Sequence, residues 1–331
     1  MGRKCFFFGC LAWLLSSYGL SRCVADDAKP PPRLVATVPF TLGSDGRMYV
    51  QARINGQVEA TFLIDTGNDV NYLSADLQDK LHLPLTPVTD DGKAGGKPSL
   101  IEGKQLMGIE PTSVVLGGGL NLTQTWFLLL PAKKLSESAL TRRPVDGIIG
   151  SRTLSRCAML LDFSRNHLVL WYPSGLTKPE ISALNLTVLY TVPISPSPSN
   201  PDIWVAHVQF TSATAAARQD MMIDTGASIT TIPAETADRL KLVGSEGGTA
   251  TLFLNKKVTI EASQVTQMQM GDFVLFSHTV RYPERPLPSY PVSVGMDIFR
   301  GYLPLIDFGQ NVMYLASAGL GVDMTIKKVI P

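Results

Sequence analysis

The segment Thr61–Gly67 reads TFLIDTG, and the segment Asp220–Gly226 reads DMMIDTG. Each begins with apolar residues and ends in Asp-Thr-Gly. An apolar strand that ends in an acidic residue, followed by a glycine that permits a tight turn, is predicted at both places. Two such segments in one chain indicate an internal repeat.

Two further pairs of segments support a duplication. Asp146–Leu154 (DGIIGSRTL) is similar to Pro291–Phe299 (PVSVGMDIF), and Leu160–Phe163 (LLDF) is similar to Leu305–Phe308 (LIDF). Both pairs are offset by the same 145 positions. Chance matches between short motifs rarely share an offset, so the repeat covers a whole folding unit.

The rest of the pattern predicts a mostly-β fold. Alternating segments at 49–54 and 204–208 are typical of strands, and 28 Gly and 23 Pro indicate many turns. Helices are predicted only after each repeated motif, at 74–81 and 233–240, with Ser74 as an N-cap. We therefore predict two β-barrel lobes related by an approximate twofold axis. The expected boundaries are 34–173 for the first lobe, 174–183 for a linker, 184–318 for the second lobe and 319–331 for a tail.

The first 25 residues have the pattern of an export signal. Arg3 and Lys4 precede an apolar core at 5–15, and Cys23-Val24-Ala25 offers small residues for cleavage after Ala25. We therefore expect export, to the periplasm or the extracellular space. A lipid anchor at Cys23 and an uncleaved signal anchor are the alternatives.

Composition narrows the function classes. The formal net charge of +1 argues against nucleic-acid binding, and no apolar run reaches the roughly 20 residues of a membrane span. Cleavage after Ala25 would leave Cys157 as the one cysteine, which we expect to be a buried structural thiol. The four histidines show no metal-ligand spacing, and we expect neither metal nor cofactor.

The repeated Asp-Thr-Gly is where we expect the chemistry. The twofold relation would bring Asp65 and Asp224 together between the lobes. Two carboxylates about 3 Å apart share one proton, because they cannot both ionise easily. The ionised member can then take a proton from water while the protonated member supports a peptide carbonyl oxygen. The pKa values would belong to the pair.

These motifs resemble the aspartic proteases, and most closely their retropepsin-like domains, here as a tandem pair covering most of residues 34–318. The resemblance implies that Asp65 and Asp224 are the catalytic dyad and that Thr66 and Thr225 lock its geometry by hydrogen bonds across the pair. It also implies a supporting set of residues around the active site: Gly67, Ile149, Gly150, Gly226, Ser228, Val294 and Gly295.

Such enzymes cover the substrate with a hairpin flap. Glycines a similar distance after each Asp, at Gly95, Gly96, Gly247 and Gly248, suit a flexible flap tip. The alternative is that both are ordinary glycine loops.

The sequence departs from the family pattern at Asn68-Asp69, which stands opposite Ala227-Ser228, and at Ser293. We predict an exported aspartic endopeptidase that acts on polypeptides as a monomer whose lobes form a pseudo-dimer. Pairing of two chains through like lobes is an alternative. The alternative function is a non-catalytic protein that keeps the fold and binds peptides or polymers.

Overall fold

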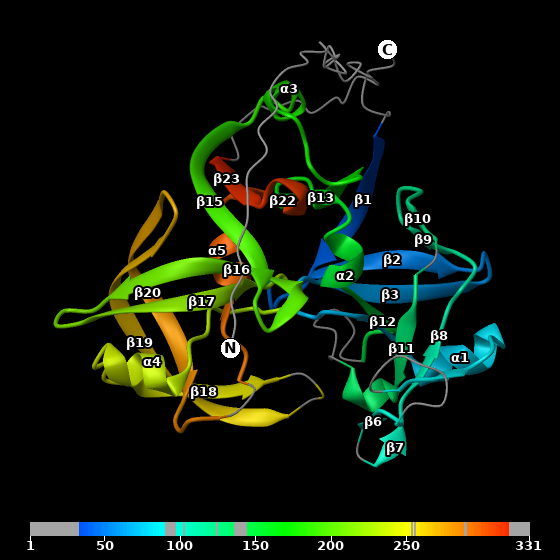
Figure 1. Cartoon of the computed structure of the whole chain (residues 1–331), viewed down its shortest axis with the longest axis horizontal. Coiled ribbons are helices and arrows are strands. Elements are labelled where there is room, and N and C mark those ends of the chain that lie inside the picture. The colour runs from blue at the N-terminus through cyan, green and yellow to red at the C-terminus, as the bar shows by residue number, and fades with distance from the viewer. Residues whose placement is uncertain are drawn as a thin grey trace, which may run out of the picture. The chain divides into compact units, whose positions relative to one another are not determined.

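The computed structural model describes residues 33–89, 97–101, 103–123, 125–135, 144–252, 254, 256–287 and 290–317. Within these residues the chain is mostly β, with five short α-helices, and it forms the two lobes that the repeat predicts (Figure 1). The predicted signal at 1–25, the whole predicted tail at 319–331, and the predicted flap glycines Gly95 and Gly96 lie outside the described residues.

The first lobe is a sheet in which β3 occupies a central place. β2 pairs with β3 antiparallel, and β12 pairs with β3 in parallel, so that Ile64 lies beside Ile149 and Asp65 beside Gly150. The alternation of β2 sends Val50, Ala52 and Ile54 into the core. The strands of the first lobe are β1 (Leu34–Leu42), β2 (Met48–Ile54), β3 (Val58–Asp65), β4 (Asn71–Ser74), β5 (Thr86–Pro87), β6 (Leu100–Ile101), β7 (Lys104–Gln105), β8 (Met107–Ile109), β9 (Val114–Leu116), β10 (Asn121–Leu122), β11 (Phe127–Leu130) and β12 (Gly147–Gly150).

The second lobe repeats this plan with longer strands. β16 pairs with β17 antiparallel, and β17 pairs with β21 in parallel, so that Ile223 lies beside Val294. The matching parallel pair therefore ends at the second Asp-Thr-Gly. The strands of the second lobe are β15 (Thr187–Ser197), β16 (Asn200–Thr211), β17 (Ala216–Ile223), β18 (Ser245–Thr251), β19 (Lys257–Met270), β20 (Phe273–Pro283) and β21 (Ser293–Val294).

A six-stranded antiparallel sheet joins the lobes in the order β1, β14 (His167–Tyr172), β13 (Ala158–Asp162), β22 (Leu303–Asp307), β23 (Val312–Ser317) and β15. Its two central strands come from the repeated LLDF and LIDF segments. Leu160 pairs with Leu305, and Met159 with Ile306. The two copies of the duplicated segment, on β13 and β22, therefore pair with each other at the centre of this sheet.

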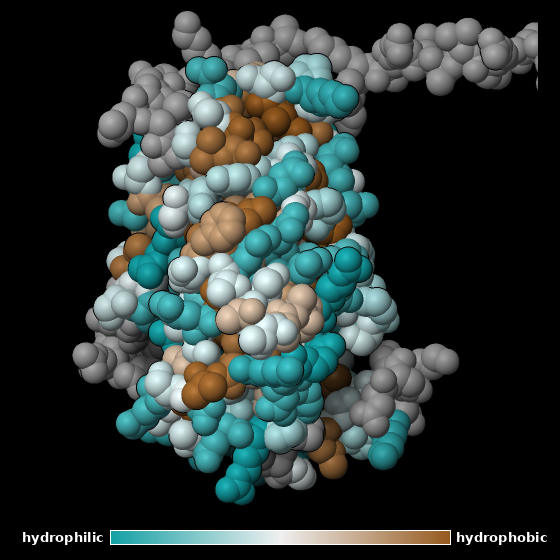
Figure 2. Space-filling model, turned by 90° about the vertical axis from the view of Figure 1, so that its left-hand side faces the viewer, coloured by the Kyte–Doolittle hydropathy of each residue, from teal (hydrophilic) through white to brown (hydrophobic). Residues whose placement is uncertain are grey.

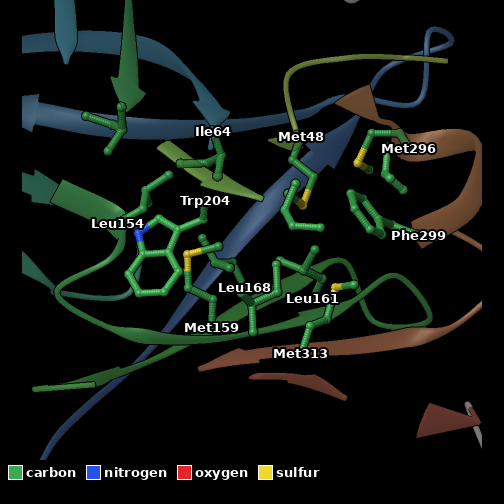
Figure 3. Packing of buried hydrophobic residues seen from close by; sticks show 14 of the residues in the cluster. Met48, Ile64, Leu154, Met159, Leu161, Leu168, Trp204, Met296, Phe299 and Met313 are labelled. Carbon is green, nitrogen blue, oxygen red and sulfur yellow. The ribbon is translucent and has the colours of Figure 1, made fainter. Parts of the chain in front are cut away.

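The core continues from one lobe into the other. Trp204 of β16 lies beside Leu154 and Met159 of the first repeat (Figure 3), and its ring centroid is 5.1 Å from that of Phe308. A core that is shared in this way couples the two halves during folding. Cys157 is buried in the same cluster, as predicted.

The described residues also form five short α-helices. Ser74 caps α1 by accepting a hydrogen bond from the Asp76 amide, which confirms the predicted helix, and α4 confirms the second. The linker predicted at 174–183 contains a helix that the sequence analysis missed, α3, which begins with a Thr177–Glu180 capping box. The helices are α1 (Ala75–Leu81), α2 (Ser151–Leu154), α3 (Lys178–Ala183), α4 (Ala234–Arg239) and α5 (Met296–Phe299).

Among the described residues, no helix has the length and apolar character needed to cross a membrane. The face shown in Figure 2 mixes hydrophilic and hydrophobic side chains over its whole height. This mixture is typical of sheets with one solvated face.

Candidate active site

Each Asp-Thr-Gly forms a tight loop that turns its carboxylate back onto its own backbone. The Gly67 and Asn68 amides donate to Oδ1 of Asp65 at 3.0 and 3.1 Å. The Gly226 and Ala227 amides donate to Oδ1 of Asp224 at 2.9 and 3.0 Å. The two loops thus have the same hydrogen bonds, and each leaves Oδ2 facing away from its own backbone.

The glycines of the two motifs show how closely the carboxyl groups approach. A Cβ on Gly226 would lie 2.2 Å from Cγ of Asp65, and a Cβ on Gly67 would lie 2.3 Å from Cγ of Asp224. No side chain fits at such distances, so each glycine makes room for the carboxyl group of the other repeat. Both aspartates are buried, with exposed fractions of 6% and 7%.

Thr66 and Thr225 connect the two loops. The Thr66 amide donates to the Thr225 hydroxyl oxygen at 3.1 Å, and the Thr225 amide donates to the Thr66 hydroxyl oxygen at 3.0 Å. Each hydroxyl in turn donates to the carbonyl that precedes the opposite Asp, on Ile223 at 2.6 Å and on Ile64 at 2.9 Å. Both side chains are fully buried. These bonds fix the positions of the carboxylates relative to each other.

The apolar-Gly segments brace the loops from behind. The Gly150 amide donates to Oδ1 of Asn71 at 2.9 Å, and the Gly295 amide donates to the Thr230 hydroxyl at 3.2 Å. Ile149 and Val294 are fully buried on β12 and β21, which pair with β3 and β17, and Ser228 lines the cavity described below. The sequence analysis missed Asn71 and Thr230, although each stands six positions after its Asp and aligning the repeats would have paired them.

Burial raises the pKa of both aspartates. Burial and, next, the negative charge of Asp65 raise the pKa of Asp224 to about 8. Burial also raises the pKa of Asp65, but hydrogen bonds from Asn68 and Gly67 and the charge of Arg47 oppose this rise. The charge of each carboxyl acts on the other, so these shifts belong to the pair and not to either residue alone.

The two carboxyls differ in the side chain that follows each Asp-Thr-Gly. The Asn68 side chain donates to Oδ2 of Asp65, whereas Ala227 has no polar side chain to offer Asp224. An amide donor stabilises the ionised form of a carboxylate. The Asn68 side chain therefore favours the ionised form of Asp65, and Asp224 has no matching donor.

A cavity of about 650 Å³ opens beside the second catalytic loop. The β18–β19 hairpin forms one wall with Thr249–Leu252 and Lys257, and Asp45 and Arg47 reach in from the first repeat. Arg47 donates to Oδ2 of Asp45 at 2.6 Å, so its charge is compensated within the cavity wall. The sequence analysis also missed this pair.

The hairpin corrects the predicted flap tip. Gly247 and Gly248 lie inside β18, at an irregularity in its pairing with β19, and the chain turns instead between Leu252 and Lys256. Gly248 has φ +86°, which suits a bulge. Leu254 at the turn packs against an apolar cluster of the first lobe that includes Tyr49 and Tyr72. The hairpin thus reaches from one lobe to the other.

A family model described as aspartyl protease matches residues 50–152 and 214–298, which together make up more than half of the chain. The chain belongs to the aspartyl protease family. The two matched regions contain the two Asp-Thr-Gly loops, one in each. The chain therefore carries the family unit twice, as the repeat predicts.

Solved structures are also similar to this chain. A retropepsin-like aspartic protease from Rickettsia conorii is 20% identical, with 43% of this chain and 94% of that chain covered and a TM-score of 0.30. Basic 7S globulin from soybean is 10% identical, with 86% of this chain and 95% of that chain covered and a TM-score of 0.45. No curated protein matches the sequence.

Proposed function

We propose that the protein hydrolyses peptide bonds with a water molecule activated between Asp65 and Asp224. The observation that carries this proposal is the meeting of two buried carboxyl groups across the hydrogen-bonded Thr66–Thr225 pair. The aspartyl protease family supports a polypeptide substrate, which would enter the cavity beside Asp224.

The asymmetry of the pair assigns the roles. Asp65, ionised and hydrogen-bonded by Asn68, takes a proton from water, whose oxygen attacks the peptide carbonyl carbon. Asp224 gives its proton to the carbonyl oxygen, which yields a tetrahedral diol. The proton on Asp65 then passes to the amide nitrogen, the C–N bond breaks, and a diol hydroxyl returns a proton to Asp224. Both carboxyls end in their starting states, so no other reactant is needed.

The test is hydrolysis of denatured casein from pH 3 to 9 by the intact protein and by Asp65→Asn and Asp224→Asn. Each variant should lose activity by at least about 10³-fold. Asp79→Asn, on the exposed side of α1, is the matched control and should keep full activity. Activity that survives in both dyad variants would rule the mechanism out. Inhibition by pepstatin would support the mechanism. If the protein resists pepstatin, the two Asp variants alone decide whether the mechanism holds.

One observation favours a second candidate, a protein that binds peptides without cleaving them. The Asn68 side chain engages Oδ2 of Asp65, the oxygen that the loop backbone leaves for water. Peptide binding by calorimetry, with no cleavage by mass spectrometry at any pH, would establish this candidate in place of the first.

We also propose that the protein is exported after cleavage behind Ala25. The basic, apolar and small-residue sections of the first 25 residues support this. N-terminal sequencing of the protein recovered from the producing cells and their medium tests it, because an intact Met1 in every fraction would overturn cleavage.

A further inference from the structure

The β15–β16 hairpin of the second repeat makes polar contacts with the first lobe. Asn200 donates through Nδ2 to Oδ2 of Asp69 at 3.0 Å. Arg152 donates through Nε and Nη2 to Oδ2 of Asp202 at 2.9 and 2.6 Å. The Asp202 amide donates to the Asn200 side chain at 3.1 Å, so the two hairpin residues act as one group.

Asp69 and Arg152 belong to the support of the first catalytic loop. The Arg152 amide donates to the Asp69 carbonyl at 3.1 Å, and the Ser151 amide donates to the Asn68 carbonyl at 2.6 Å. Asn68 is the residue whose side chain donates to Asp65. A continuous path of hydrogen bonds and covalent links therefore runs from the hairpin to the ionised carboxylate.

The second catalytic loop has different residues at the matching positions. Ser228 stands where the first repeat has Asp69, and Asp297 stands where it has Arg152. Asp297 accepts hydrogen bonds from Thr230, within its own lobe. In the first repeat, the matching hairpin residue Asp45 pairs with Arg47 and Tyr49 of the same hairpin. Asp45 therefore pairs within its own hairpin, whereas Asp202 pairs with Arg152 of the other repeat.

We propose that Asn200 and Asp202 are positioning residues, which hold the first catalytic loop so that Asn68 stays on Asp65. This inference rests on the proposed function for its kinetic consequences. The side chains of Arg152 and Asp202 are 58% and 31% exposed, and surface ion pairs of this kind contribute little to overall stability. Their removal should therefore change catalysis more than folding, because small displacements of reacting groups cost much in rate.

The experiment compares Asn200→Ala, Asp202→Arg, Arg152→Asp and the charge-swapped double variant Arg152→Asp with Asp202→Arg. Each single variant should lower kcat about tenfold with little change in KM. Each should also move the acid limb of the pH–rate profile to higher pH, because a displaced Asn68 no longer favours ionised Asp65. The double variant should recover most of kcat. The matched control is Arg53→Glu or Glu59→Arg, because these residues form an ion pair in which both side chains are 60% exposed. Neither control should change kcat or the acid limb.

The Asp65 carboxyl is also titrated by NMR in each variant, which separates this inference from the proposed function. If the intact protein proves inactive, the proposed function fails. A raised Asp65 pKa in Asp202→Arg that the charge swap reverses would then still support positioning. An unchanged Asp65 pKa in Asn200→Ala and Asp202→Arg would overturn it. Equal losses of activity and of thermal stability without rescue would also overturn it, since they would show a merely structural role.

Discussion

Thr66 and Thr225 exchange hydrogen bonds across the interface of the two repeats, each backbone amide donating to the hydroxyl oxygen of the other residue at 3.1 and 3.0 Å. Each hydroxyl then donates its proton to a carbonyl of the opposite strand. The amide and the hydroxyl of each threonine are thus hydrogen-bonded by groups of the opposite repeat. The position of each carboxyl group relative to the other therefore depends on the assembly of the two lobes.

Replacing either threonine should therefore affect both stability and activity. Thr66→Ala leaves the Thr225 amide and the Ile223 carbonyl without partners in a buried place, and each such loss costs about 1–3 kcal/mol. We expect a decrease in the free energy of unfolding of about 2–5 kcal/mol in urea titrations. Thr66→Ser keeps the hydroxyl and should lose less than half as much. Equal losses in the Ala and Ser variants would contradict the role of the hydroxyl.

Asp224→Asn should make the protein more stable at neutral and higher pH. The pKa of Asp224 is raised to about 8 in the fold, whereas an unfolded Asp ionises near 3.8. Its contribution to stability is thus fully present below pH 3.8 and is lost as the pH rises through 8. The neutral amide has no such loss, so the melting temperature of the variant should exceed that of the parent at pH 8 more than at pH 4. Asp79→Asn should show no such trend.

Activity should extend to neutral pH and fall above a pH of about 8, because the working pair needs the one shared proton that it loses there. Asn68→Ala removes a donor that favours ionised Asp65, so the acid limb of the profile should move to higher pH. Initial rates on a peptide substrate from pH 3 to 9 measure both limbs. An acid limb that stays in place in the variant would show that Asn68 does not set the ionisation of Asp65.

Gly226→Ala should abolish activity by separating the carboxyl groups. Its Cβ would lie 2.2 Å from Cγ of Asp65, so the loops must move apart by more than an ångström to accept it. We expect a rate loss of at least about 10²-fold, as misplaced catalytic groups show. Gly301→Ala is the control, because its Cβ would meet only the Ile298 carbonyl oxygen at an ordinary 3.5 Å. A crystal structure of the Gly226 variant would show the displacement directly.

Much of the fold could be predicted from the sequence because duplication leaves paired signals. The two Asp-Thr-Gly segments and the LLDF and LIDF segments lie at matching places in the structure, the latter pairing at the centre of the shared sheet. The N-cap at Ser74 predicted α1, whereas the Thr177–Glu180 capping box of α3 was missed because the prolines and glycine around it indicated a linker. The short helices α2 and α5 were missed because four residues carry too little periodicity to be recognised.

The remaining parts depend on contacts between distant residues, which the sequence pattern does not contain. Nothing in the sequence around Arg152 indicates that its side chain forms an ion pair with Asp202 of the other repeat. The flap tip was predicted at the wrong place because glycine is common in β-bulges as well as in turns. Gly248, with its positive φ, lies at a bulge. Arg47 was missed because its effect on Asp65 arises only after folding brings them together.

The unlike side chains at Asn68 and Ala227 have a consequence for which way a substrate can lie. A polypeptide runs from amino to carboxyl end, and a perfectly symmetric pair of lobes would accept it in either sense. Here one carboxylate accepts a hydrogen bond from the side-chain amide of Asn68, and Ala227 offers the other no such donor. Under the proposed mechanism the leaving nitrogen takes its proton from Asp65, so the two unlike halves favour a single orientation of the substrate, which identical subunits cannot do.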